Sequence, residues 1–322
     1  MKDIELFANG QKYVIPNSWD SLDSDTYIAL VGDLLLMSSG QISAGEVRIK
    51  LLCRLMHWKL EKFKDDDAVA SLLVLSEQLT FLFTINYPNP EILAVLNNED
   101  REKYLRIDPY SLHTKYAEIL KKQDYKYVVD LCFAAQLIPV LKIDDKLYRG
   151  YVIDTSFNTL TCSLTALQYI EARSIDVDNI ETLPLLAAIL YYPRNKEYDS
   201  GYAHRLAKKF AGLSAPVLFA ISFNFQAFNN FLFTKTEFSL LTKFKPQPDK
   251  SITTDASDAL YELSKDGLGD AKQIEQMNLI TYLRVLRKNT ISAVKSLSGM
   301  GLDKLKISTE VGLPINIIDN IL

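Results

Sequence analysis

Histidine and cysteine are the residue types with which this chain could bind a metal or perform nucleophilic catalysis. Its three histidines are His57, His113 and His204, and Cys53 lies four residues before His57, so these two side chains share one face of an expected helix. Two ligands fall short of the four that a structural zinc site uses. A Cys–His nucleophile pair also needs an orienting group and an oxyanion site, which the sequence does not supply. We therefore expect a buried Cys53 with His57 at its rim, and neither a metal nor a cofactor.

Two glycine pairs and one acidic run also lack the pattern of a ligand site. Residues 267–269 (GLG) and 299–301 (GMG) have no third glycine and no Walker-type Gly-Lys-Ser/Thr. Both are typical of turns and helix ends. Residues 65–67 (DDD) stand at an expected helix start, where acidic side chains complement the helix dipole. Because no catalytic constellation is found, we predict that the protein is not an enzyme.

The end of the chain has the pattern of a helix-turn-helix, with Gly312 in the turn. The segment after Pro314 contains no Lys or Arg and carries Asp319, whereas a helix that reads DNA needs polar or basic side chains at base edges. We expect its apolar stripe to dock on its own chain or on a neighbour; the stripe comprises Ile315, Ile318 and Leu322. The alternative is a nucleic-acid-associated regulator that uses this segment with a small basic cluster, Arg284, Arg287 and Lys288.

Phenylalanines crowd the segment 219–233. The run comprises Phe219, Phe223, Phe225, Phe228, Phe231 and Phe233. Stacking platforms for single-stranded nucleic acid pair aromatics with a basic groove, but residues 212–233 contain no Lys or Arg. Helical spacing favours a core stripe for Phe219, Phe223 and Phe231. The other three are candidates for contact with another subunit, because aromatics are enriched at interfaces.

An internal sequence repeat predicts the elements that position these residues. Residues 13–22 (YVIPNSWDSL) return as residues 151–160 (YVIDTSFNTL). Trp19 and Phe157 take equivalent places and are candidate interface residues. Three further echoes keep the same order: 27–28 with 169–170, 51–52 with 185–186, and 81–84 with 231–234. These echoes predict a duplicated globular unit.

Each copy is expected to open with a β-hairpin and to continue in helices. The first hairpin joins residues 4–7 and 11–15 through Asn9-Gly10, a pair that favours a two-residue turn. The second joins 140–143 and 147–153. Caps at Asp23 or Ser24, at Ser43 with Glu46, and at Ser163 or Thr165 begin helices. Further helices are expected at 66–85, 91–96, 99–105, 111–122, 127–137, 182–192, 200–211 and 214–233.

After the second copy, residues 245–248 (KPQP) and a polar run to residue 255 indicate a linker. Helices are expected at 255–265, at 270–297 and after Pro314. The predicted fold is therefore mainly α with two small β-hairpins, as a tandem duplicated helical domain plus a C-terminal helical region. Its parts are residues 1–138, the first copy; 139–245, the Phe-rich second copy; and 246–322, the linker and C-terminal region.

Composition narrows the class of protein. The chain has 322 residues, 48% hydrophobic and 24% charged, with a net charge of −4, so a surface that grips nucleic acid through phosphates is not expected. Three scattered cysteines indicate a reducing compartment. The charged N-terminus has no signal-peptide pattern. The most apolar stretch, 68–85, contains Glu77 and favours a buried helix over a membrane span.

Two short motifs carry a resemblance to a family. Residues 14–22 (VIPNSWDSL) resemble the I-P-x-S-W-x-x-L-T opening of uncharacterised virion structure and tail assembly proteins of tailed phages that infect gut Bacteroidetes. Residues 185–193 (LLAAILYYP) are similar to an L-x-A-x-L-Y-R-P segment of the same proteins, with Tyr192 in place of the arginine. The resemblance extends to about Phe233, no motif matches after Pro246, and it implies no catalytic residues.

Together these observations predict a non-enzymatic phage virion structural or head/tail morphogenesis protein that acts through protein–protein contacts. Its expected partners are other phage structural or assembly proteins, with the chain itself a homo-oligomer or ring component, and neither membrane nor nucleic acid is expected. The expected location is the virion or the host cytoplasm. The candidate interface residues are Trp19, Phe157, Phe225, Phe228, Phe233, Ile315, Ile318 and Leu322.

Overall fold

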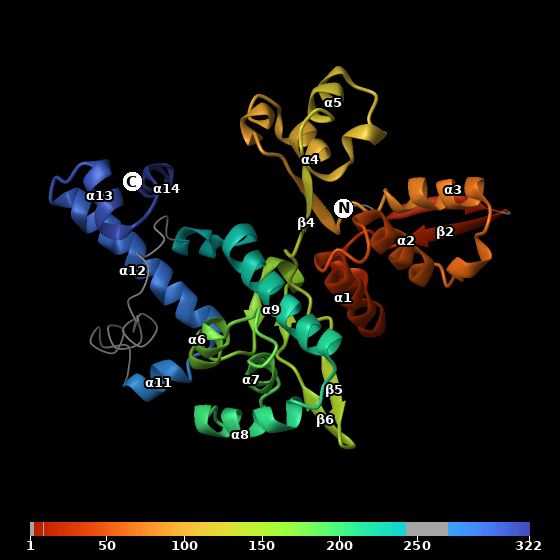
Figure 1. Ribbon diagram of the computed structural model, residues 1–322. Helices are drawn as coiled ribbons and strands as arrows, with labels where there is room; N and C mark the ends of the chain where they lie inside the picture. The colour runs from red at the N-terminus through yellow and green to blue at the C-terminus, as the bar shows by residue number, and fades with distance from the viewer. Residues whose placement is uncertain (1–2, 9, 243–269) are drawn as a thin grey trace. The chain divides into compact units, whose positions relative to one another are not determined.

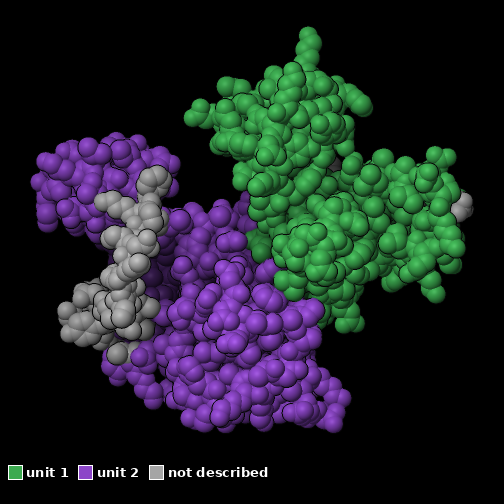
Figure 2. Space-filling model, in the orientation of Figure 1, with its two compact units in different colours: residues 1–131 green, residues 132–322 purple. Residues whose placement is uncertain are grey.

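A computed structural model describes residues 3–8, 10–242 and 270–322. These residues are mainly helical, as predicted, with thirteen α-helices. They form four two-stranded antiparallel sheets rather than the two hairpins expected. The chain divides into two compact units, residues 1–131 and 132–322 (Figure 2). The expected three-part division and the duplication both stay predictions. The predicted linker, the helix at 255–265 and the glycine pair at 267–269 lie outside the described residues.

Unit 1 begins with the expected hairpin and two well-capped helices (Figure 1). Strands β1 (Ile4–Ala8) and β2 (Gln11–Ile15) pair in antiparallel register, and a 3₁₀ turn, η1 (Trp19–Ser21), follows. The Asp23 carboxylate caps α1 (Ser24–Ser38). Ser43 and Glu46 form the predicted capping box of α2 (Ala44–Leu55).

The rest of unit 1 corrects two helix predictions. Helix α3 (Asp66–Ser76) ends well before residue 85, and residues 127–137 are not helical. Instead β3 (Phe83–Asn86) pairs with β4 (Lys126–Val129), since β-branched residues on both strands suit a pleated ribbon. Between these strands lie η3 (Pro90–Leu93), α4 (Asn98–Arg106), η4 (Pro109–Ser111) and α5 (Lys115–Leu120), so the helices expected at 91–96 and 111–122 are shorter than predicted.

Charged side chains join the parts of unit 1. On α1, the buried Asp33 carboxylate lies 3.2 Å from Lys50 Nζ and 2.5 Å from Arg54 Nη1, both on α2. On the same helix α2, the buried Arg48 guanidinium lies 5.2 Å from the ring centre of Phe83 and 4.8 Å from that of Tyr127. The two aromatic faces stabilise this buried cation and fix α2 to the β3–β4 ribbon.

Unit 2 opens with β5 (Val140–Ile143) paired to β6 (Lys146–Arg149), and β7 (Ile153–Asp154) paired to β8 (Thr161–Cys162). Thr165 and Gln168 form a capping box at the start of α6 (Ala166–Ser174). The helices α7 (Leu183–Leu190), α8 (Ser200–Phe210) and α9 (Ala215–Lys235) follow, and α9 ends in η6 (Glu237–Leu241). Helix α9 buries nine of its side chains along its length, which makes it the central helix of this unit.

The helix expected at 270–297 is broken. It consists of α11 (Ala271–Glu275) and α12 (Leu279–Gly299). Between them the backbone pairs with the segment before α6: Ala166 N–H donates to Met277 O at 2.8 Å, and Leu279 N–H donates to Leu164 O at 2.9 Å. The Asn278 side chain then caps α12. The chain ends in α13 (Lys304–Val311) and α14 (Ile315–Ile321). Among the described residues, no helix is long and apolar enough to cross a membrane.

A buried side-chain amide on α9 fixes the first residues of unit 2 to this helix. The Asn224 side chain accepts a hydrogen bond from Leu137 N–H and donates one to Ala135 O, each at 2.8 Å. We expect Asn224→Leu to lower the free energy of unfolding by about 2–4 kcal/mol, because both bonds to buried backbone are lost. The matched control Gln226→Leu, whose amide bonds Ser222 within the helix, is expected to cost about 1 kcal/mol. Urea unfolding of both variants measures the difference, and equal losses would contradict a clamp by Asn224.

Candidate functional site

Four of the eight candidate interface residues are buried in this structure. Trp19, Phe225, Phe228 and Ile318 are at most 4% exposed. The Trp19 indole N–H donates to Asp130 O at 2.8 Å, so its polar end is satisfied within unit 1. Phe225 and Phe228, predicted to contact another subunit, lie on the buried side of α9. The predicted core stripe is wrong, because its members are only half-buried: Phe219, Phe223 and Phe231. Each of the four buried candidates is therefore part of the interior of its own unit.

The other four candidates reach the surface. Phe157 is 98% exposed, Leu322 51% and Ile315 43%. Phe233 is half-buried, and the Arg173 guanidinium lies 5.5 Å from its ring centre. Phe157 is the most exposed of these residues, so its ring forgoes the free energy that a large apolar side chain gains from leaving water.

Phe157 stands on a short connection between β7 and β8, which we call the Phe157 loop (residues 155–160). The Asp154 carboxylate accepts a hydrogen bond from Ser156 N–H at 2.8 Å, and bonding to Ser156 lowers the pKa of this carboxyl. Thr159 donates both its N–H, at 3.0 Å, and its hydroxyl, at 2.8 Å, to Ser156 O. These bonds fix the loop from both of its ends.

The backbone at Phe157 is strained. Phe157 has φ 54° and ψ 32°, and Asn158 follows with φ 56°. The left-handed region suits glycine, and asparagine tolerates it, whereas for a bulky residue such as phenylalanine it is costly. Strain of this kind persists where surrounding structure enforces it, and it is often found at functional positions. The loop therefore presents an aromatic ring to solvent at a cost in stability.

The Phe157 loop lines a pocket of about 460 Å³, which we call the α9–α12 pocket; Phe157 itself is not among the lining residues. One wall is the Phe157 loop itself, and the others are the end of α9, η6 and the start of α12. Apolar side chains contribute much of its lining, and charged side chains stand among them. The lining residues are Thr155, Asn158, Thr159, Leu160, Phe231, Lys235, Thr236, Glu237, Phe238, Ile280 and Arg284.

The charges near this pocket are partly paired. Glu237 lies 3.4 Å from Arg287 Nη1 and 3.9 Å from Arg284 Nε, and Arg287 Nε–H also donates to Glu237 O at 3.2 Å. Two of the three residues in the predicted basic cluster thus share one carboxylate. Because these side chains are substantially exposed, each pair contributes little to stability. They reduce the local positive charge that phosphate binding would use.

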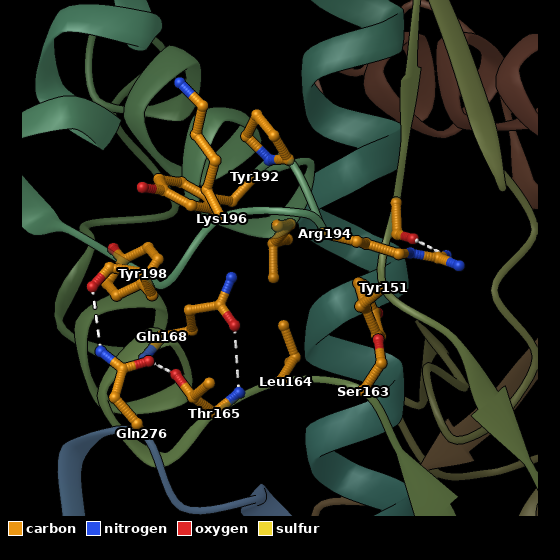
Figure 3. Close-up of a pocket in the computed structure, with 13 residues that line it drawn as sticks. Tyr151, Ser163, Leu164, Thr165, Gln168, Tyr192, Arg194, Lys196, Tyr198 and Gln276 are labelled. Carbon is orange, nitrogen blue, oxygen red and sulfur yellow. Dashed lines mark hydrogen bonds between the residues drawn. The ribbon is translucent and has the colours of Figure 1, made fainter. Parts of the chain in front are cut away.

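A second pocket in unit 2, of about 250 Å³, lies where the predicted motif ends at Tyr192 and Pro193 (Figure 3). Its polar groups are largely engaged: the Gln168 amide accepts from Thr165 N–H at 3.0 Å, and the Gln276 amide donates to Tyr198 O at 3.0 Å. Arg194 and Lys196 extend in different directions rather than toward one point. The lining contains no histidine, cysteine or carboxylate side chain, so it offers no general base with an ordinary pKa near neutrality.

The residues first considered for metal or nucleophilic chemistry do not form a site. Burial raises the pKa of the Cys53 thiol, which disfavours the reactive thiolate, and His57 is exposed as expected at the rim. Asp65 caps α3 by accepting from Asp67 and Ala68 N–H groups. Among the described residues, no group of three histidine, cysteine, aspartate or glutamate side chains could hold a metal ion.

The C-terminal helices pack on their own chain. Gly312, with φ 71°, ends α13 in the left-handed conformation, as its predicted place in the turn requires. Ile318 lies at 0% exposure in a small core with Val294, Ile307 and Leu313. One residue of the predicted stripe therefore docks within the chain, while Ile315 and Leu322 stay partly exposed.

Comparison with known proteins gives no match for this chain among protein-family models, curated proteins or solved structures.

Sequence reasoning selected Phe157 only through its alignment with Trp19, and it missed the pocket beside it. No local signal marks that pocket, because the Phe157 loop lies about 75 to 125 residues before the other segments that form its walls. The hydrophobic pattern of the sequence does not specify how such distant segments pack. The left-handed backbone at Phe157 could not be predicted either, since the tripeptide Ser-Phe-Asn contains no glycine.

The three cysteines differ in accessibility. Cys53 and Cys162 are buried, and burial raises the pKa of Cys162 to about 12, whereas Cys132 is half-buried. We expect a disulfide-exchange reagent at pH 8 to modify one thiol rapidly in the folded protein and three in urea. Cys132→Ser should remove the rapid reaction. Rapid reaction of two or more thiols would show that the packing around β8 or α2 is looser than described.

Backbone strain at Phe157 predicts an inverted preference between alanine and glycine. Both substitutions remove the ring, so their difference reports on the backbone. We expect Phe157→Gly to be more stable than Phe157→Ala by about 1 kcal/mol, because glycine accepts positive φ. At Ser292, an exposed position within α12, the order should reverse, with glycine less stable than alanine by about 1 kcal/mol. Thermal and urea unfolding measure both pairs, and the same order at both positions would disprove strain at Phe157.

Proposed function

We propose that this protein is a non-enzymatic assembly component that works through protein–protein contacts made by the Phe157 loop and the α9–α12 pocket. The single observation that carries this proposal is the Phe157 ring, 98% exposed on a strained and hydrogen-bonded loop. Aromatic anchors that fit into pockets supply much of the binding energy of protein interfaces. The hydrogen bonds of the Phe157 loop fix its backbone, so the backbone loses little conformational entropy when a partner covers the ring.

The phage part of the proposal is supported by the sequence motifs alone. The resemblance of residues 14–22 and 185–193 to phage virion and tail assembly proteins suggests head or tail morphogenesis, with other phage structural or assembly proteins as partners. The corresponding location is the virion or the host cytoplasm. A nucleic-acid-associated regulator stays the alternative, and the carboxylate of Glu237 between Arg284 and Arg287 does not favour it.

A tandem duplication fits this role and remains a proposal. Both expected copies contain, in order, a hairpin, a 3₁₀ turn and two helices: η1 and η5 (Ser156–Asn158) lie 137 residues apart, and α1–α2 corresponds to α6–α7. The second copy differs in having β7 and β8 on either side of its 3₁₀ turn. One echo argues against strict equivalence, since Phe83 and Thr84 lie in β3 while Phe231 to Thr234 lie within α9. At the equivalent turn, Trp19 is 4% exposed and Phe157 is 98% exposed. Two related units with different surfaces suit a protein that contacts different neighbours.

Particle incorporation tests this function. In cells producing the phage, we expect the wild-type chain to be recovered with virions or with head or tail precursors. Phe157→Ala should reduce that recovery at least tenfold, because the anchor is lost. Phe7→Ala is the matched control: Phe7 is also an exposed phenylalanine, at 74%, but lies on β1 in unit 1. Quantitative mass spectrometry of purified particles gives the readout. Absence of the wild-type chain from all particles and precursors, or equal recovery of Phe157→Ala and wild type, would overturn the proposal.

A further inference from the structure

We infer that the α9–α12 pocket receives the Phe157 ring of a second copy of this chain, so that two copies dock symmetrically. This inference rests on the proposed contact function and names the occupant of the contact surface. It is carried by one juxtaposition: the exposed ring and the pocket belong to the same small patch. Residues on both sides of Phe157 line the pocket, namely Thr155 before it and Asn158, Thr159 and Leu160 after it.

A two-fold axis requires this arrangement. In a symmetric dimer the same patch occurs on both partners, so a protruding group and the cavity that receives it must lie side by side. Were they far apart, the same contact would instead propagate copies head to tail. Phe157 does not enter the pocket of its own chain, because its ring is 98% exposed. The bonds from Ser156 to Asp154 and Thr159 fix the loop backbone on both sides of Phe157.

The pocket matches an aromatic guest in size and chemistry. Its volume is about 460 Å³, and an apolar cavity of about 150 Å³ is enough to hold a benzene ring. Phe231, Phe238 and Ile280 provide apolar and aromatic contacts. A phenyl ring can therefore enter beside aromatic side chains without displacing the chain's own residues.

The charges of the lining are self-complementary. Both signs of charge are present, since Lys235, Arg284 and Glu237 line the pocket. Glu237 lies 3.9 Å from Arg284 Nε and 3.4 Å from Arg287 Nη1, whereas among the residues that the structure describes Lys235 has no acidic side chain within 4.0 Å. When a patch with both signs meets its own copy across a two-fold axis, each sign can face the other. A strongly acidic or strongly basic partner would be attracted by the pocket side chains of one sign and repelled by those of the other.

The contact should be weak and reversible. Each aromatic ring buries about 150–250 Å². Two insertions with the matching pocket surface therefore bury roughly 600–1,000 Å², at or below the low end of specific interfaces. We accordingly expect a concentration-dependent dimer with a dissociation constant of about 10–100 μM.

Sedimentation velocity of the full chain from about 1 to 200 μM tests this affinity. We expect the wild type and the conservative variant Phe157→Trp to dimerise, and Phe157→Ala to stay monomeric throughout. Leu147→Ala is the matched control, because Leu147 is an exposed apolar residue, at 60%, on β6 of the same unit. It should dimerise as the wild type does. A wild-type chain that stays monomeric, or a dimer unaffected by Phe157→Ala, overturns the inference.

Site-specific photocrosslinking locates the guest ring. With benzoylphenylalanine at position 157, we expect a covalent dimer whose crosslinked peptides include residues 231–238 or 280–284 of the other copy. The same probe at position 7 should not crosslink there. Crosslinks elsewhere, or no covalent dimer at 200 μM, count against symmetric docking. If no second copy is captured while Phe157→Ala still abolishes particle incorporation, self-docking fails and the proposed function stands. If dimers form as expected but particles do not depend on Phe157, the proposed function fails instead.

Discussion

The amide of Asn224 is the interaction on which unit 2 depends. It sits at 1% exposure in the middle of a helix whose other buried residues are phenylalanine, leucine, isoleucine and alanine, with Ser222 as the one other polar residue. An apolar helix of this kind could rotate or slide with little loss of hydrophobic free energy, because its packing is not directional. The two bonds of Asn224 to Ala135 O and Leu137 N–H are directional, so they fix both the rotation and the register of α9 against the incoming chain.

That register determines what α9 presents at its C-terminal end. With Phe225 and Phe228 in the core, Phe231 and Lys235 fall at the wall of the α9–α12 pocket. Thr236 then ends the helix, and its hydroxyl donates to Leu232 O and accepts from Phe238 N–H, which turns the chain into η6. The pocket is thus a consequence of how a buried helix is anchored about ten residues away, rather than of any local surface motif.

The sequence predicted best where local chemistry decides the structure. The box at Ser43–Glu46 forms as predicted, and the structure selects Asp23 and Thr165 from the alternative caps that the sequence offered. Each of these caps needs only side chains within one helical turn. Predictions failed where distant segments compete for the backbone. Residues 83–86 lie next to an apolar helical pattern yet pair with 126–129, and residues 276–278 leave a helix to bond with 164–166. Neither partner can be recognised from a local window, since periodicity describes one segment at a time.

The candidate interface shows the same division between local and distant control. Trp19 and Phe157 have similar neighbours in sequence, but Trp19 finds Phe81 at 5.2 Å and Tyr27 at 6.2 Å between ring centres, and Asp130 O for its indole N–H. In unit 2 the aligned residue is Phe157, which follows Asp154. The Asp154 carboxylate accepts a hydrogen bond from Ser156 N–H, and the backbone of Phe157 lies in the left-handed region, without comparable ring contacts among the described residues. A proline, Pro16, occupies the place of Asp154 in unit 1 and cannot accept that side-chain bond. The exchange of proline for aspartate is therefore one local difference that accompanies the burial of Trp19 and the exposure of Phe157.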